Sequence, residues 1–264
     1  MRNRVTPVVK YLLIINIGMY ILTWLLQRTG IDLYRIFGLF NVKSEYFHPY
    51  QFITHMFMHG GLLHIFFNMY ALYLFGIILE RVWGSQRFLL FFIITGLGAA
   101  ALQSLVNWWM VHNLADQIQQ FMVNPTLENF KILALKYPNL LNGNVKAIMQ
   151  NWNSVDINQI RSQLNVILQS QMNIPTVGAS GAIFGLLMAF GFIFPDVPLM
   201  FIFIPIPIKA KWFVIGYGIL ELFSGLLNIT GDNIAHFAHL GGMLFGYIIL
   251  KIWYKKNWRH PQNY

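Results

Sequence analysis

Two residues of this sequence could form a catalytic pair, because each stands beside glycines at the start of an apolar segment. Ser180 lies in the run Gly178-Ala179-Ser180-Gly181, and His239 opens the run His239-Leu240-Gly241-Gly242. A serine hydroxyl becomes an effective nucleophile when a neighbouring base accepts its proton, and histidine is the most frequent base. Together the two residues indicate nucleophilic catalysis inside a lipid bilayer.

The composition places the chain among integral membrane proteins. Of its 264 residues, 56% are hydrophobic and 10% are charged, and the mean hydropathy is +0.53. These values are too apolar for an ordinary soluble domain. The chain has no cysteine, which excludes disulfides, thiolate metal sites and a cysteine nucleophile.

Long apolar segments predict an all-α, polytopic bundle of six transmembrane helices, because a span needs about 20 residues. The expected spans are 10–28, 57–79, 88–112, 178–195, 212–229 and 234–254. No small-residue cleavage site follows the first apolar run, so we expect that run to be retained as a span. Two prolines, Pro205 and Pro207, exclude a helix from the connector 198–207, which we place at the membrane surface.

The placement of lysine and arginine predicts the direction of the spans. With the N-terminus in the cytoplasm, eleven of the 18 basic residues and two of the nine acidic residues fall on the cytoplasmic side. This distribution satisfies the positive-inside rule, so the net charge of +9 is a topology signal and does not call for nucleic acid as a partner. Both termini are then cytoplasmic, and the second, fourth and sixth spans all begin at the exterior face.

We expect a single membrane-embedded domain over residues 1–264, with two larger segments outside the membrane. One is an exterior loop at 29–56, and the other is a long polar exterior insertion at 113–177. Helical spacing of apolar residues predicts an amphipathic surface helix in the insertion. The residues with this spacing are Ile148, Trp152, Ile157, Ile160, Leu164 and Ile167.

The start of the segment at 178–195 has two interpretations. A helix N-terminus offers unpaired backbone N–H groups and a positive dipole end, so an oxyanion formed by attack of Ser180 would meet donors there. Neighbouring glycines would also let a substrate come close. Alternatively, Gly178, Gly181 and Gly185 are small residues that allow membrane helices to pack closely.

The segment at 234–254 carries two histidines near its start. His236 and His239 are three residues apart and therefore lie on roughly one helix face. Gly242 and Gly246 follow at the GxxxG spacing of close packing, so the helix that carries His239 can lie against the helix that carries Ser180. An ionisable residue inside a membrane is costly and often functional. The alternative is a histidine that only makes a hydrogen bond inside the bundle.

A third group of polar residues opens the segment at 57–79, where His55, His59 and His64 precede Asn68. His64 and Asn68 are four residues apart and share one helix face. An oxyanion hole needs two such donors aimed at one point, and loss of one donor typically costs about 10²–10³ in rate. Hydrogen bonding between helices is the alternative interpretation.

The acidic residues indicate no third member for the pair. Asp232 is the carboxylate nearest to His239 in sequence, and together with Asn233 it is typical of a helix cap. Glu221 falls inside the span 212–229, and we assign it no role. We therefore expect a Ser–His dyad.

These residues resemble the motifs of the rhomboid intramembrane serine proteases, and the resemblance covers the six-span core. It rests on three motifs in the order in which that family has them, on the second, fourth and sixth spans. The motifs are His64 and Asn68 preceded by His59, the run Gly178-Ala179-Ser180-Gly181, and the run His239-Leu240-Gly241-Gly242 with Gly246.

The resemblance implies that Ser180 is the nucleophile and His239 the base. It implies an oxyanion hole formed by His64, Asn68 and the backbone N–H of Ser180. Phe184 matches the position of an aromatic residue that stacks on the catalytic histidine. The activity implied is hydrolysis of a peptide bond in or near the transmembrane segment of a membrane-protein substrate, with no cofactor and no metal.

Two alternatives to this activity stay open. One is an inactive rhomboid-like protein that binds transmembrane segments without cutting them. The other is a membrane protein whose histidines hold a metal or haem, although the sequence has no His-Glu-x-x-His motif and no carboxylate accompanies these histidines. The chain also departs from many family members, because Tyr50-Gln51 stands where they carry a Trp-Arg pair in the first exterior loop.

The same resemblance and topology give the expected surroundings. The partners would be transmembrane protein substrates and the lipid bilayer, with no nucleic acid. We expect a multi-pass protein of a bacterial inner (cytoplasmic) membrane, with the active site toward the exterior face.

Overall fold

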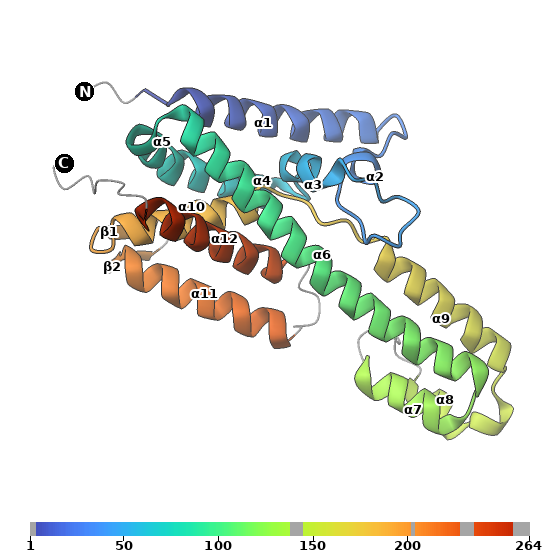
Figure 1. Cartoon of the computed structure of the whole chain (residues 1–264). Coiled ribbons are helices and arrows are strands. Elements are labelled where there is room, and N and C mark those ends of the chain that lie inside the picture. The colour runs from blue at the N-terminus through green and yellow to red at the C-terminus, as the bar shows by residue number, and fades with distance from the viewer. Residues whose placement is uncertain (1–3, 138–144, 202–203, 228–234, 256–264) are drawn as a thin grey trace. The chain divides into compact units, whose positions relative to one another are not determined.

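The computed structural model describes residues 4–137, 145–201, 204–227 and 235–255 (Figure 1). The chain divides into two compact units. The first comprises Met1–Leu39, His48–Gln103 and Pro175–Tyr264, and the second comprises Phe40–Phe47 and Ser104–Ile174. Ser180, His239 and the other polar residues singled out above all belong to the first unit.

The first unit is a helical bundle with one small β-hairpin. Its longer helices are α1 (Pro7–Gln27), α4 (Leu62–Ala71), α5 (Ile77–Trp83), the first part of α6 (Ser85–Val123), α10 (Ser180–Ile193), α11 (Ala210–Leu227) and α12 (His236–Lys255). A π-helical turn, η2 (Leu72–Gly76), joins α4 to α5. The short elements are α2 (Leu33–Phe37), α3 (Gln51–Thr54), the 3-10 turn η1 (His55–Phe57), β1 (Pro198–Phe201) and β2 (Ile204–Lys209).

Five helical segments in the described part of the chain are long and apolar enough to cross a membrane. They are Pro7–Gln27, Leu62–Trp83, Ser85–Val123, Ala210–Leu227 and His236–Lys255. The all-α, polytopic membrane fold is therefore confirmed. The connector 198–207 was expected to lack a helix, and strands β1 and β2 lie there. The predicted span at 178–195 was too long. There α10 has 14 residues, about 21 Å at 1.5 Å per residue, against about 30 Å of hydrocarbon.

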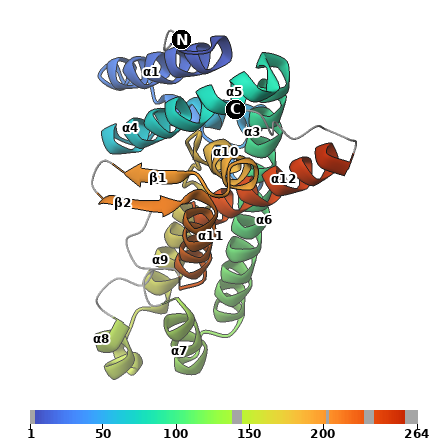
Figure 2. The same ribbon diagram turned by 90° about the vertical axis from the view of Figure 1, so that its left-hand side faces the viewer.

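α10 is the centre of the first unit. Ten of its 14 residues are buried, and both views place it between α4 and α12 (Figures 1 and 2). Phe88, Phe91 and Phe92 of α6 are fully buried in the same core. The neighbouring helices therefore cover most of α10, which explains how a helix this short fits at the centre of the bundle.

The N-terminus of α1 is held by a buried carboxylate. The backbone N–H groups of Val8 and Val9 donate to the two carboxylate oxygens of Glu80, at 3.0 and 2.9 Å. The hydroxyl of Ser85 donates to the same carboxylate at 2.6 Å. Glu80 thus satisfies the free donors of a helix end and fixes α1 against α5.

The second unit contains the rest of α6, α7 (Leu127–Lys136), α8 (Val145–Gln150), the turn η3 (Trp152–Ser154) and α9 (Ile157–Met172). It has a core of its own, made of Leu114, Ile118, Phe121, Phe130, Leu133, Ile160 and Leu164. The insertion 113–177 contains a helix, as predicted, in α9, whereas Ile148 lies in α8 and Trp152 in η3. Helix α6 continues past residue 112 to Val123.

Candidate active site

A glycine with a positive φ leads the chain into α10. Gly178 has a φ of +121°, a backbone conformation that L residues other than glycine rarely adopt. Its N–H donates to the carbonyl oxygen of His55 at 2.9 Å. A Cβ atom at this position would lie 2.6 Å from Nε2 of His64. Gly178 therefore sets the entry into the helix and leaves room for the His64 ring.

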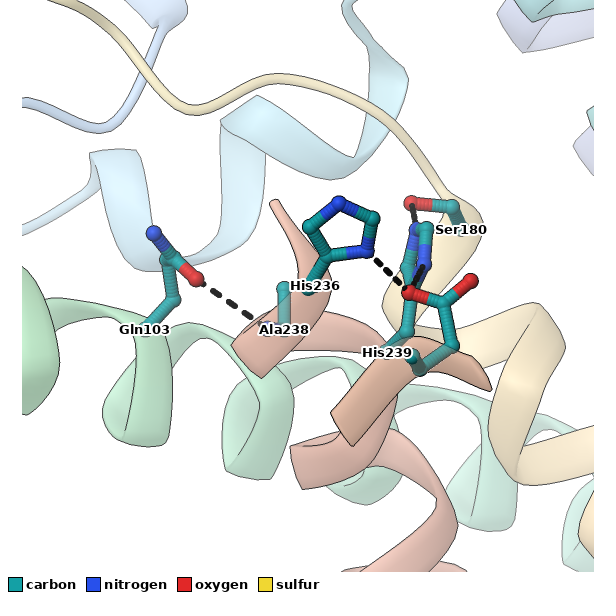
Figure 3. A network of polar contacts seen from close by, with 6 residues as sticks. Gln103, Ser180, His236, Ala238 and His239 are labelled. Carbon is teal, nitrogen blue, oxygen red and sulfur yellow. Dashed lines mark hydrogen bonds and ion pairs between the residues drawn. The ribbon is translucent and has the colours of Figure 1, made fainter. Parts of the chain in front are cut away.

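Ser180 and His239 are in hydrogen-bond contact, although 59 residues separate them in sequence. Nε2 of His239 lies 2.9 Å from Oγ of Ser180 (Figure 3). Ser180 is the first residue of α10, so its backbone N–H has no acceptor within the helix. His239 lies on the first turn of α12 and is 8% exposed. The structure thus places a hydroxyl, a base and a free backbone donor at one point.

An aromatic ring fixes the plane of the His239 imidazole. Phe184 stacks on it with the ring centroids 4.0 Å apart and the planes at 7°. Tyr217 of α11 packs on the ring of Phe184, with the two ring centroids 4.9 Å apart. The predicted contact between Phe184 and the histidine is present in the structure.

Glycines bring α12 against α10. A Cβ atom on Gly242 would collide with the carbonyl oxygen of Gly181, and one on Gly246 would lie 3.2 Å from the carbonyl oxygen of Gly185. A Cβ atom on Gly181 would collide with Ala99 of α6. The packing interpretation of the glycine-rich start is therefore confirmed. The glycines pack the helices, and this packing sets the distance between Ser180 and His239.

The two side chains predicted as oxyanion donors, His64 and Asn68, both belong to α4. The backbone N–H of Gly60 donates to Nδ1 of His64 at 3.4 Å, which leaves the ring proton on Nε2, the atom beside Gly178. Asn68 is 5% exposed, and its Nδ2 has no hydrogen-bond partner in the part of the chain that the structure describes. Both groups can donate to a ligand.

The two remaining histidines of this region have structural contacts. Nδ1 of His55 lies 2.9 Å from the carbonyl oxygen of Gln51, and burial lowers the pKa of His55 to about 4. His59 is 1% exposed and meets His64 edge to face, with the ring centroids 5.0 Å apart. The hydroxyl of Tyr34 donates to the carbonyl oxygen of His59 at 2.7 Å.

Gln51 anchors the loop in which a Trp-Arg pair is absent. It is fully buried, its Nε2 donates to the carbonyl oxygen of Ile36 at 3.2 Å, and its Oε1 accepts from the backbone N–H of His48 at 3.1 Å. Tyr50 is exposed and stacks on the ring of His48, with the planes at 8°. The amide of Gln51 thus ties together two segments of the loop 29–56.

A carboxylate stands beside the histidines, contrary to the sequence expectation. Oε2 of Glu221 lies 2.9 Å from Nδ1 of His239 and 2.6 Å from Nδ1 of His236. Glu221 comes from α11, and its neighbours in sequence gave no sign of this contact. The one available signal was an acid inside an apolar span, which is costly unless paired. Asp232, the carboxylate considered earlier, lies outside the described residues.

These three side chains are also the one group in the described part of the chain with the composition of a metal site. The ligand atoms of Glu221, His236 and His239 all lie within 4.8 Å of one another. Imidazole and carboxylate are ligands that zinc accepts. The sequence premise that no carboxylate accompanies these histidines was therefore wrong. A metal would compete with the contacts between Oε2 and the two Nδ1 atoms.

Comparison with known proteins identifies the family. A family model described as the rhomboid domain matches residues 46–112 and 148–256. The chain belongs to the rhomboid family. The match includes every element that contributes to the Ser180 site. The residues between the two matched segments lie in the second unit.

Three plant rhomboid-like proteins share part of this rhomboid. Rhomboid-like protein 11, a chloroplastic protein of Arabidopsis thaliana, is 31% identical over 98 residues, which are 37% of this chain and 31% of the relative. The mitochondrial rhomboid-like protein 6 of the same plant is 38% identical over 95 residues, 33% of this chain and 31% of the relative. Rhomboid-like protein 15 is 38% identical over 79 residues. The matched segments therefore span less than a third of these relatives.

Proposed function

We propose that this rhomboid is an intramembrane serine endopeptidase. Ser180 is the nucleophile and His239 is the base that activates it. The observation that carries the proposal is the 2.9 Å contact between Ser180 Oγ and His239 Nε2. Family membership supports it, because the rhomboids are known as intramembrane serine proteases.

The reaction follows from the positions of these groups. Oγ of Ser180 attacks the carbonyl carbon of the scissile bond while Nε2 of His239 takes the hydroxyl proton. The oxyanion accepts hydrogen bonds from the Ser180 backbone N–H, His64 and Asn68. His239 then donates its proton to the leaving amine as the C–N bond breaks. A water molecule then attacks the carbonyl carbon of the acyl-enzyme while Nε2 of His239 takes its proton, and the ester bond breaks as His239 returns the proton to Ser180 Oγ.

The substrate is the transmembrane segment of another membrane protein. A peptide bond inside a helix is protected by the hydrogen bonds of that helix, and nothing in lipid replaces them. The substrate must therefore unwind near the cut, and small or helix-breaking residues favour cleavage. We place both termini in the cytoplasm of a bacterial cell and the site toward the exterior face of the inner membrane, as the charge distribution favours.

The test is cleavage of a reporter substrate with one transmembrane segment by the purified protein in proteoliposomes. Ser180→Ala should abolish cleavage, whereas Ser104→Ala, a half-buried serine of α6 outside the site, should leave the rate within about twofold. Cleavage by Ser180→Ala at the wild-type rate would overturn the proposal. Binding of the reporter with no cleavage by the wild type would favour an inactive rhomboid that only holds transmembrane segments.

A metal-dependent activity is the second candidate, because Glu221, His236 and His239 gather within 4.8 Å. The two candidates differ in their response to metal removal. A serine protease retains cleavage after dialysis against a chelator, since none of its proposed steps uses a metal. Loss of cleavage that returns on addition of zinc would instead support the metal.

A further inference from the structure

Helix α11 buries few of its side chains in the bundle, and Glu221 is one of them. Of its 18 residues, Ala210, Val214 and Glu221 are buried. Glu221 is 5% exposed. A carboxylate buried among apolar helices costs free energy, and an apolar residue of similar volume would often serve stability as well or better. The presence of Glu221 at this position therefore points to a task other than packing.

Glu221 contacts one nitrogen of the His239 ring, and Ser180 contacts the other. Its Oε2 lies 2.9 Å from Nδ1, whereas Ser180 Oγ lies 2.9 Å from Nε2. A neutral imidazole carries one proton, and a carboxylate beside Nδ1 selects the form with that proton on Nδ1. Nε2 then has a free lone pair, which is what the hydroxyl of Ser180 needs. The Nδ1 contact has ion-pair distance but lacks hydrogen-bond alignment, as is common before substrate binds.

His236 holds the carboxylate in this position. Its Nδ1 lies 2.6 Å from the same Oε2, and its side chain is 12% exposed. Figure 3 shows His236 and His239 projecting from the start of α12 on the side of Ser180. Two other titratable groups lie near the cluster, Tyr217 near Glu221 and His64 near His239. The carboxylate is thus fixed between two rings on α12.

We propose that Glu221 is a positioning residue that completes a Ser180–His239–Glu221 triad, and that His236 orients its carboxylate. The inference rests on the proposed protease function. During acylation the bond from Ser180 Oγ to the carbonyl carbon forms and the C–N bond breaks. The proton moves from Oγ to Nε2 and on to the leaving nitrogen. Glu221 keeps its negative charge throughout and stabilises the imidazolium across 2.9 Å.

The first experiment separates this role from a structural one. Glu221→Gln keeps the shape of the side chain, and Glu128→Gln on the exposed side of α7 is its control. We expect Glu221→Gln to lower kcat by up to about 10⁴-fold, the loss known for amide replacement of a triad aspartate, with KM and the melting temperature near wild type. Glu221→Asp should recover at least tenfold over Glu221→Gln. Glu128→Gln should cleave at the wild-type rate.

A second measurement does not depend on activity. Nitrogen-15 NMR of histidine-labelled Ser180→Ala protein reports which ring nitrogen of His239 carries the proton, with the signal assigned by His239→Gln. We expect the proton on Nδ1 in this background and a mixture of tautomers when Glu221→Leu is added. An unchanged tautomer in Glu221→Leu would overturn the triad, as would full kcat in Glu221→Gln. If Ser180→Ala itself cleaves, the protease proposal fails instead.

Discussion

Gly242 of α12 lies so close to Gly181 of α10 that a Cβ atom would collide with the Gly181 carbonyl oxygen. Gly181 is the residue after Ser180, and Gly242 is three residues after His239. The approach of the two backbones therefore sets the distance between the Ser180 hydroxyl and the His239 imidazole. The proposed chemistry depends on the same glycines as the helix packing.

Gly242→Ala should push α12 away from α10. We expect destabilisation of about 1–3 kcal/mol, the usual cost of overpacking, and a loss of cleavage larger than the loss of folded protein. Gly216→Ala on α11 is the matched control, because a Cβ atom there has no neighbour within 4 Å. Thermal unfolding in detergent and cleavage of the reporter measure the two effects. Equal behaviour of the two variants would contradict this role of Gly242.

Gly178→Ala should impair the site in two ways. The backbone there has a φ of +121°, and the new methyl group would press on His64 Nε2. We expect a loss of cleavage of about 10²-fold or more, comparable to the removal of one oxyanion donor. Gly61→Ala has an extended backbone and open space around its Cβ atom, so it should keep the wild-type rate. A wild-type rate for Gly178→Ala would show that His64 has no part in the site.

Phe184→Leu should keep the core filled but remove the stacked ring from His239. Aromatic pairs of this kind contribute about 0.5–1.5 kcal/mol, so we expect kcat to fall roughly two- to tenfold. Phe192→Leu, further along the same helix, is the control and should not change kcat. Steady-state kinetics on the reporter measure both. An increase in KM alone would mean that Phe184 contacts the substrate rather than positioning the histidine.

The stability of the fold should decline in mild acid. Burial lowers the pKa of His55 to about 4 in the folded protein, whereas the unfolded value is about 6.5. Below pH 6.5 His55 binds a proton in the unfolded chain but stays neutral in the folded protein down to about pH 4. The free energy of unfolding is therefore highest above pH 6.5 and falls toward pH 4, by about 3 kcal/mol. Melting temperatures from pH 4 to pH 7.5 test this. His55→Gln should flatten the dependence, and an unchanged slope in that variant would exclude His55 as its source.

Much of the site could be predicted because it depends on local spacing. The helical repeat alone places His64 with Asn68 and Ser180 with Phe184 on common faces, and GxxxG spacing predicts the close approach of α12. These relationships hold within one helix or follow from the size of glycine.

Glu221 could not be assigned from the sequence, because its partners lie on another helix. Which face of α11 turns inward depends on packing against α12, and most of α11 is apolar on every side. The same limit applies to α10. A segment of 14 residues reads as a longer span when its apolar flanks are counted, and only the structure shows where its last turn ends.

The most direct test of the central claim is covalent labelling of the nucleophile. A fluorophosphonate reacts with a serine hydroxyl only when a neighbouring base activates it. We predict that mass spectrometry of the wild-type protein finds the adduct on Ser180, and that His239→Gln reduces it at least 10²-fold while His236→Gln reduces it less than about tenfold. Equal labelling of Ser180 in His239→Gln and wild type, or an adduct on another serine, would contradict the account.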